Sequence, residues 1–293
     1  MGALQSIYPN ADATAQERHI LRISCTAEPG IVAAVTTALA ECGGNLVESA
    51  QFLDESTDRF FLRIGFLASQ GADIAAALAP VQARFGFGID LEPATRKPRL
   101  IIMVSKFDHA LLHLLYQIRV GWLSADVVAI VSNHPYAGDI ATREGVPFHH
   151  WPVTPETKPD VEANLLDLAD TLGADLVVLA RYMQVLSDDL TQRLSGRAIN
   201  IHHSFLPSFK GAKPYHQAYA RGVKHIGATA HYVTADLDEG PIIEQDVERI
   251  SHVMKPDDLV AIGRDIESRV LARAVKLHLE GRVLLNGAKT VIL

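Results

Sequence analysis

Residues 174–207 read ADLVVLARYMQVLSDDLTQRLSGRAINIHHSFLP. Two short apolar runs in this stretch, residues 176–180 and 199–201, are each followed at once by polar side chains, beginning with Arg181 and His202. Short apolar runs bounded by polar residues are typical of strands that are buried on both faces. The stretch therefore predicts two buried strands, each with a polar cluster at its carboxyl end.

The same pattern extends outward from this stretch in both directions. Apolar runs and helical patterns precede it at residues 100–104, 110–120, 127–131 and 161–172. Strand-like stretches at 226–234 and 241–247, a long helix at 256–280 and a short final strand follow it. Continuous apolar strands that alternate with helices indicate a parallel sheet covered on both faces. We therefore expect an α/β domain over residues 99–293, with a mostly parallel sheet that becomes mixed near its end.

Residues 19–93 show another order of patterns, namely strand, helix, strand, strand, helix, strand. Apolar residues recur with helical spacing between Ile31 and Cys42, whereas they alternate along a strand from Phe60 to Phe66. These two periods predict a small α+β domain over residues 19–93. Two prolines and no apolar periodicity follow, so we assign residues 94–98 to a linker and residues 1–18 to a polar leader.

The composition excludes several classes of protein. Of 293 residues, 48% are hydrophobic and 21% are charged, which is ordinary for a globular protein. The 27 basic and 34 acidic residues give a formal net charge of −7, so nucleic-acid binding is not expected. No apolar stretch approaches the roughly 18 to 20 residues of a membrane helix. Cys25 and Cys42 are the two cysteines, which we interpret as buried thiols, and we expect a cytoplasmic protein.

Asn200 and His202 lie at the end of the strand predicted at 199–201 and could carry chemistry. Side chains alternate along a strand, so these two point to the same side. An amide and an imidazole placed side by side can both donate hydrogen bonds to one developing oxyanion, which suits acyl chemistry. The alternative is an Asn200 that caps a turn and a His202 whose hydrogen bonds are satisfied in the core. For an arbitrary Asn-x-His this alternative is the commoner case.

Two further clusters flank this one in the sequence. Residues 236–241 read DLDEGP and lie between two predicted strands, so Asp238 could serve as a base, or the loop could be a solvated hairpin turn. Residues 181–186 read RYMQVL and follow another strand, where their main chain could bind a flat ligand. Ligands of open α/β sheets sit at the carboxyl ends of the strands. The clusters are therefore candidates for a single site.

Thirteen histidines raise the alternative of a metal site. Zinc sites usually show tight ligand spacing, such as His-Glu-x-x-His, and no such motif is present in this sequence. The sequence also lacks a Gly-x-Ser-x-Gly elbow, a Walker loop and a Gly-x-Gly-x-x-Gly turn after any strand. We therefore expect no catalytic metal and no nucleotide cofactor.

Three blocks together carry a resemblance to a known family. RYMQVL at 181–186, NIHHSFLP at 200–207 and LDEGPII at 237–243 occur in the order seen in the formyltransferases that use 10-formyltetrahydrofolate. GAKPYHQA at 211–218 resembles the formyltetrahydrofolate deformylase branch of that family, and His203 replaces a proline common in the glycinamide ribonucleotide transformylases. Residues 19–93 are similar to an ACT domain. The resemblance implies a ferredoxin-like βαββαβ domain followed by a Rossmann-like formyltransferase domain.

The resemblance also implies roles for individual residues. The catalytic trio of the family falls on Asn200, His202 and Asp238. Residues that would hold the folate, largely through main-chain groups, are Met183, Gln184, Val185, Leu186 and Asp236. In the ACT-like domain, Gly30 and Asn45 are the positions expected to contact an effector, and glycine or methionine is the kind of effector that the family implies.

The activity implied is hydrolysis of 10-formyltetrahydrofolate to tetrahydrofolate and formate, which would supply formate for purine synthesis and balance the one-carbon folate pool. The folate is then the substrate and no cofactor is expected. The alternative is formyl transfer to a small amine. After the strand at 100–104 the chain lacks the glycine-rich turn that would cradle a ribonucleotide phosphate. We also expect a homo-oligomer, such as a tetramer, with the strand from Phe60 to Phe66 offering a surface to share.

Overall fold

The computed structural model describes residues 16–207 and 214–293. Most of the polar leader predicted for residues 1–18 lies outside the described residues, as do residues 211–213 of the deformylase-like run. The chain divides into two units, Met1–Arg96 and Lys97–Ile292. This division falls within the segment predicted as a linker.

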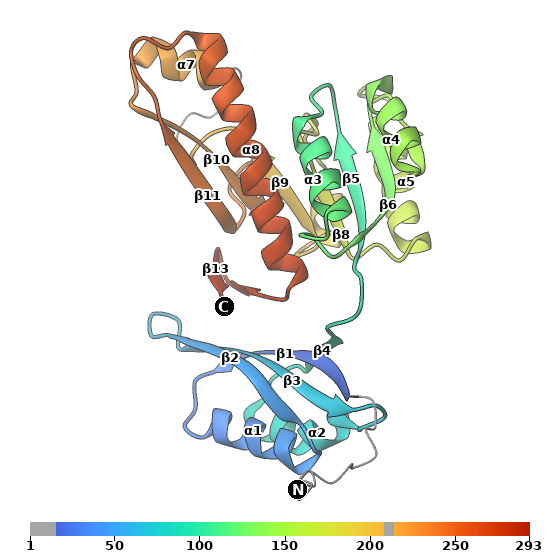
Figure 1. Cartoon of the computed structure of the whole chain (residues 1–293), viewed down its shortest axis with the longest axis vertical. Coiled ribbons are helices and arrows are strands. Elements are labelled where there is room, and N and C mark those ends of the chain that lie inside the picture. Colours follow the sequence, from blue (N-terminus) through green and yellow to red (C-terminus); the bar gives the residue numbers. More distant parts are fainter. Residues whose placement is uncertain (1–15, 208–213) are drawn as a thin grey trace, which may run out of the picture. The chain divides into compact units, whose positions relative to one another are not determined.

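Unit 1 is a four-stranded sheet with two helices (Figure 1). Its elements are β1 (Gln16–Thr26), α1 (Ile31–Glu41), β2 (Asn45–Asp54), β3 (Arg59–Ser69), α2 (Ile74–Phe85) and β4 (Asp90–Pro93). The strands lie in the order β2-β3-β1-β4, and every neighbouring pair is antiparallel. The order of helices and strands is the one predicted. The first strand begins at Gln16, so the last three residues of the predicted leader belong to it.

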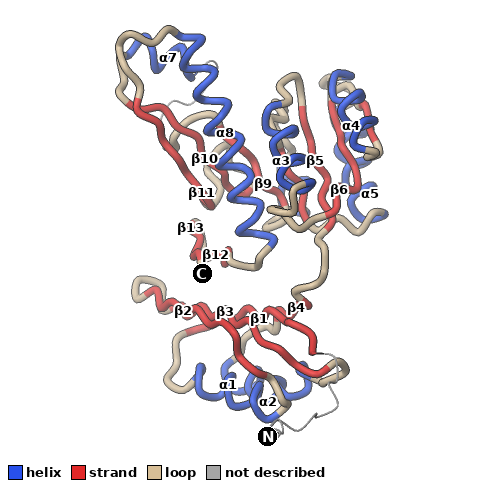
Figure 2. Tube along the Cα trace, viewed as in Figure 1, coloured by secondary structure: helices blue, strands red, loops and turns tan. Residues whose placement is uncertain are grey.

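The core of unit 1 lies between the sheet and its helices. Both helices lie on one side of the sheet (Figure 2). Val35 and Leu39 of α1 and Leu62 and Phe66 of β3 are completely buried in one cluster. The alternation from Phe60 to Phe66 therefore marks the face of β3 that packs on the helices. Our expectation that this face is a surface to share between chains is wrong, because the helices of the same unit cover it.

Unit 2 is an α/β domain built on a seven-stranded sheet. Its elements are β5 (Arg99–Val104), α3 (His109–Arg119), β6 (Asp126–Ser132), η1 (Pro135–Ala137), α4 (Gly138–Glu144), β7 (Phe148–His150), α5 (Lys158–Thr171), β8 (Leu176–Leu179), α6 (Asp188–Arg193), β9 (Ala198–His202), α7 (Pro214–Arg221), β10 (His225–Tyr232), β11 (Ile242–Arg249), α8 (Pro256–Leu279), β12 (Val283–Asn286) and β13 (Lys289–Ile292). The final strand predicted from the sequence is in fact the hairpin of β12 and β13.

The sheet order is β11-β10-β9-β8-β5-β6-β7. Neighbouring strands are parallel except at β10, which is antiparallel to both β9 and β11. The prediction of a mostly parallel sheet that becomes mixed near its end is confirmed. The chain runs from β5 to β6 and β7 on one side and then crosses to β8 and β9 on the other. In such sheets, ligands bind where the order reverses, between the carboxyl ends of β5 and β8.

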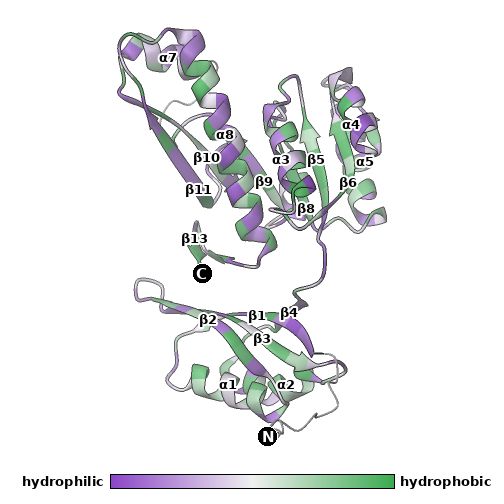
Figure 3. Ribbon diagram, in the orientation of Figure 1, coloured by the Kyte–Doolittle hydropathy of each residue, from purple (hydrophilic) through white to green (hydrophobic). Residues whose placement is uncertain are grey.

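Helices cover both faces of this sheet. Leu100, Ile102 and Val104 of β5 pack into one core with α3 and α8, while Ile101 and Met103 pack into a second core with α5 and α6. In Figure 3, α8 shows alternating hydrophilic and hydrophobic bands, as expected for a helix with one buried face. The two cores hold the strands in place, so their polar ends have fixed positions.

Candidate active site

A cavity of about 630 Å³ lies in unit 2, beside the ends of β8 and β9 and the loop between β10 and β11. The structure brings together in its lining every residue that was predicted for catalysis or folate binding. These residues are Asn200, His202, Asp238, Met183, Gln184, Val185, Leu186 and Asp236. Segments that lie as far apart in the sequence as 183 and 238 therefore form one site.

Asn200 and His202 are positioned by β9, whose two-residue period places both side chains in this cavity. His202 is buried, with 6% of its surface exposed. The antiparallel register pairs Asn200 with His231 of β10, and His202 with Thr229. The antiparallel strand β10 thus supplies a cross-strand neighbour for both Asn200 and His202.

Asp238 lies in the loop between β10 and β11, with a left-handed φ of 58° that aspartate adopts more readily than most residues. Its Oδ1 lies 3.1 Å from Nδ1 of His202. Because a carboxylate oxygen only accepts hydrogen bonds, this nitrogen carries the hydrogen. Burial raises the pKa of Asp238, but the hydrogen bonds and charges of His202 and His231 outweigh burial and hold that pKa well below its ordinary value. The carboxylate is therefore ionised at neutral pH.

His231 is a site residue that sequence reasoning missed, since we considered it only as a possible metal ligand. Its Nδ1 lies 2.8 Å from the carbonyl oxygen of Tyr232, which can only accept, so Nδ1 carries a hydrogen. Its Nε2 faces both Nδ2 of Asn200, at 3.3 Å, and Oδ1 of Asp238, at 3.7 Å. The buried imidazole therefore connects the amide and the carboxylate of the predicted trio.

A close approach of main-chain atoms fixes the loop that carries Asp238. A Cβ atom on Gly240 would overlap the carbonyl group of Tyr232. The amide of Tyr232 donates to the carbonyl oxygen of Pro241 at 3.0 Å. Only glycine fits this position without a shift of the chain, so Gly240 helps to set where Asp238 lies.

A second polar cluster lines the same cavity, and sequence reasoning missed its centre, Glu267 of α8. Glu267 is 1% exposed, accepts hydrogen bonds from Tyr215 at 2.6 Å and His109 at 2.9 Å, and pairs with Arg181 at 3.2 Å. Burial raises the pKa of Glu267, but His109, Arg181 and Tyr215 lower it below its ordinary value. A carboxylate on the apolar stripe of a predicted helix was the signal that could have revealed it.

His203 also lines the cavity, next to His202. Burial, together with the charges of Arg181 and His202, lowers the pKa of His203 to about 4. The ring is therefore neutral at physiological pH. Its Nδ1 is buried and has no hydrogen-bond partner among the described residues.

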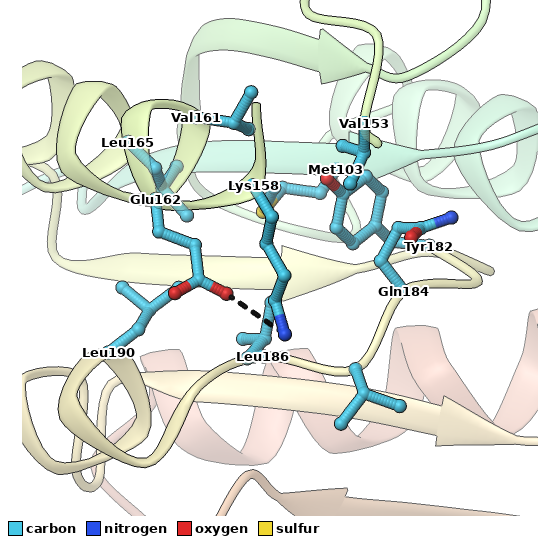
Figure 4. A pocket seen from close by; sticks show the side chains of 11 residues that line it. Met103, Val153, Lys158, Val161, Glu162, Leu165, Tyr182, Gln184, Leu186 and Leu190 are labelled. Carbon is cyan, nitrogen blue, oxygen red and sulfur yellow. Dashed lines mark ion pairs between the residues drawn. The ribbon is translucent and has the colours of Figure 1, made fainter. Parts of the chain in front are cut away.

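The 181–186 loop forms another part of the lining. It begins at Arg181, which has a left-handed φ of 65°, and it continues through the buried Tyr182 to the half-exposed Met183 and Val185. Figure 4 shows Tyr182, Gln184 and Leu186 around a smaller pocket on the side of α5. The loop thus lies between this smaller pocket and the main cavity.

The two residues predicted to contact an effector are not brought together in unit 1. Gly30 precedes α1, just after the end of β1 at Thr26, which pairs with Arg59. Asn45 begins β2 and pairs with Leu67. Arg59 and Leu67 lie eight residues apart on β3, or about 26 Å at 3.3 Å per residue. A single amino acid could not contact both positions within one chain.

Within residues 16–207 and 214–293, no group of three or more His, Cys, Asp or Glu side chains is arranged to hold a metal ion. Both cysteines are free thiols, and Cys42 is only half-buried, contrary to our prediction. In the same described part of the chain, no helix has the length and apolar character needed to span a bilayer.

Comparison with known proteins gives one consistent result. Residues 98–275 match the family described as Formyl transferase. The formyltetrahydrofolate deformylase of Corynebacterium sp. (strain P-1) is 51% identical over 282 residues, which cover 95% of this chain and 99% of that protein.

Solved structures extend the comparison to three dimensions. The formyltetrahydrofolate deformylase from Burkholderia mallei matches with a TM-score of 0.91 and 50% identity, covering 94% of this chain and 99% of that one. Glycinamide ribonucleotide transformylase 1 from Symbiobacterium toebii matches with a TM-score of 0.64 and 32% identity, over 70% of this chain and 98% of that one. The likeness to deformylases thus extends over nearly the whole chain, whereas the likeness to the transformylase covers less of it.

Proposed function

Since the chain belongs to the formyltetrahydrofolate deformylases within the formyl transferase family, we propose that it hydrolyses 10-formyltetrahydrofolate to tetrahydrofolate and formate. One observation carries the proposal. Asn200, His202 and an ionised Asp238 converge in a cavity that the 181–186 loop also lines. Donors for an oxyanion and a carboxylate for a water molecule thus meet where a folate could be held.

The chemistry needs a water molecule to attack the formyl carbon. The carbonyl oxygen becomes an oxyanion, to which Asn200 donates through Nδ2 and His202 donates through Nε2 in its imidazolium form, since the Nδ1 hydrogen is directed at Asp238. One such donor lowers the activation barrier by roughly 3 to 4 kcal/mol. The bond between carbon and N10 then breaks, and N10 takes up a proton while formic acid leaves and ionises to formate. The His202 imidazolium can supply that proton through Nε2, which has no hydrogen-bond partner among the described residues.

Asp238 has two tasks in this scheme. It holds His202 through Nδ1, and it is the carboxylate nearest to the oxyanion donors, so it can orient the attacking water and accept its proton. His231 supports both tasks, because it contacts Asn200 and Asp238 at once. No metal or cofactor has a step in this proposal.

Hydrolysis is favoured over formyl transfer by the lining of the cavity near β5. After β5 the chain continues with Ser105, Lys106 and Phe107 rather than with a glycine-rich turn. The guanidinium groups of Arg181 and Arg264 lie 5.8 and 5.0 Å from the centre of the Phe107 ring, and all three side chains line the cavity. Bulky side chains therefore stand after β5 where a glycine-rich turn would cradle the phosphate of a ribonucleotide acceptor.

Unit 1 is proposed to be an ACT-type regulatory domain, supported by its βαββαβ order and by its place before the catalytic unit. Glycine or methionine is the proposed effector. Because Gly30 and Asn45 lie beyond opposite ends of α1, one ligand could meet both only if two copies of the chain supplied them. This supports the proposal of a homo-oligomer, such as a tetramer. We further propose a cytoplasmic enzyme whose formate serves purine synthesis.

The test is release of formate from 10-formyltetrahydrofolate by the purified protein without an amine acceptor, with a chelated sample and Asp238→Asn in parallel. We expect formate from the wild type, with or without chelator, and little from the variant. No formate despite correct folding would contradict hydrolysis. Formate or formyl transfer that appears only on addition of a small amine would establish the alternative.

A further inference from the structure

Two side chains outside the main cavity hold the 181–186 loop at two points. We propose that Ser105 and Glu162 are positioning residues that fix the main chain of this loop for folate binding. The inference rests on the proposed function, because it assigns the loop to the folate. Neither residue lines the cavity that holds Asn200, His202 and Asp238.

Ser105 is the first residue after β5 and is 4% exposed. Its Oγ accepts a hydrogen bond from the main-chain amide of Met183 at 3.0 Å. The same hydroxyl donates to Oδ1 of Asn133, at 2.7 Å, just beyond the end of β6. The hydroxyl therefore connects the ends of three strands. Its bond to Met183 crosses from β5 to the chain after β8, where the strand order of the sheet reverses.

Glu162 holds the chain immediately after the loop. Its Oε1 accepts a hydrogen bond from the main-chain amide of Ser187 at 3.0 Å. Nζ of Lys158, one turn earlier on α5, lies 3.8 Å from the same oxygen, and Figure 4 shows this pair beside Tyr182 and Leu186. The Glu162 side chain is only 14% exposed, so its bond to Ser187 is largely shielded from water.

Within the loop, the side chains of Tyr182 and Leu186 pack against the hydrophobic core, whereas Met183 and Val185 are 52% and 55% exposed. A ligand held by main-chain groups needs those groups in a fixed place before it binds. Removing either acceptor leaves a part-buried amide without its partner and frees one end of this segment. Asn200, His202 and Asp238 lie on other segments, so binding is affected more than the chemical step.

The decisive comparison is Glu162→Ala with Glu162→Gln, because the glutamine keeps an oxygen that can accept from Ser187. Ser105→Ala removes the other acceptor, the hydroxyl group that is bonded to the amide of Met183. Glu144→Ala is the matched control, since Glu144 is an ion-paired glutamate on α4, 3.2 Å from Arg119 and remote in sequence from the loop. The measurements are KM and kcat for formate release, and the Kd for tetrahydrofolate.

We expect Glu162→Ala and Ser105→Ala to raise both KM and Kd roughly 5- to 20-fold, with kcat changed less than about 2-fold. Glu162→Gln and Glu144→Ala should stay close to the wild type. An unchanged Kd in both alanine variants, or equal losses in the glutamine and alanine variants, would overturn the inference. If the wild type releases no formate, the proposed function fails, while the Kd values still decide whether the loop binds folate as proposed.

Discussion

At the scale of single residues, two imidazole rings, those of His202 and His231, stabilise the ionised form of the Asp238 carboxyl group. Burial alone would raise the pKa of this carboxyl group, yet the hydrogen bonds and charges of His202 and His231 lower it below its ordinary value. The group is thus ionised throughout the neutral range, and its protonation does not set the acid limit of activity. Its removal, rather than its titration, reveals its role.

Asp238→Asn should therefore lower kcat by about 100-fold or more at every pH near neutrality. The amide keeps the size of the side chain but cannot accept a proton from water and adds no charge beside His202. Steady-state formate release measures the effect, with circular dichroism as the control for folding. Near-normal turnover in a folded variant would show that Asp238 is not needed for water attack.

His203 should make stability depend on pH. Its pKa is about 4 in the folded chain against an ordinary value of 6.5, so between these values the unfolded chain takes up a proton that the folded chain refuses. The stability due to neutral His203 is complete above pH 6.5 and is lost as the pH falls toward 4. His203→Asn should remove this dependence, which is at most about 1.4 kcal/mol per pH unit.

Urea unfolding of both proteins at about pH 7.5 and about pH 5 measures this difference. The two proteins differ only at residue 203, so the difference between them reports on that position. Equal losses of unfolding free energy on acidification would contradict the assignment of a neutral, buried ring.

The residues of the site differ in how visible they are in the sequence. Asn200 and His202 could be predicted to share a face because the two-residue period of a strand is local. His231 could not, because its contact with Asn200 depends on the antiparallel register of β10 against β9, which no local pattern shows. Glu267 lies between these cases, since its place on the apolar stripe of α8 was visible but its three partners were not.

At the scale of elements, the hairpin of β10 and β11 delivers Asp238 to the site. Gly240→Ala should displace its loop, because the added Cβ would overlap the carbonyl group of Tyr232. We expect a loss of kcat of about 10-fold or more, with a stability loss of roughly 1 to 3 kcal/mol typical of overpacking.

Gly88→Ala is the matched control, since a Cβ on Gly88 meets nothing within 4 Å. Formate release and thermal unfolding of the two variants measure the contrast. If Gly240→Ala kept full turnover, the position of Asp238 would not depend on this close approach.

The elements that could be predicted from the sequence are those long enough to show a complete apolar run or a repeating apolar pattern. The strands β5, β6, β8 and β9 and the long helix α8 each showed such a run or pattern, and their bounds agree within a few residues. The helices α4 and α6, of seven and six residues, were missed because so short a segment gives no complete pattern. The apolar face of β3 could be predicted, but the helices that cover it could not. An alternating apolar pattern shows that one face of a strand is buried, but it does not show which element buries that face.

At the scale of the whole molecule, the two units have separate hydrophobic cores. All the residues that line the main cavity belong to unit 2. A protein of residues 97–293 should therefore keep the formate-releasing activity, within about 10-fold of the full chain, and lose any response to glycine or methionine.

Activity assays of this shortened protein beside the full chain, with and without each amino acid, provide the test. Circular dichroism shows whether unit 2 has folded without unit 1. A folded but inactive unit 2 would show that unit 1 takes part in catalysis.

The division of the chain also has a spectroscopic consequence. Both tryptophans, Trp122 and Trp151, belong to unit 2. Tryptophan emission therefore reports on the catalytic half alone, whereas far-ultraviolet dichroism sums the signal of both halves. A denaturation curve followed by both signals separates the melting of the two halves without labels or added chromophores.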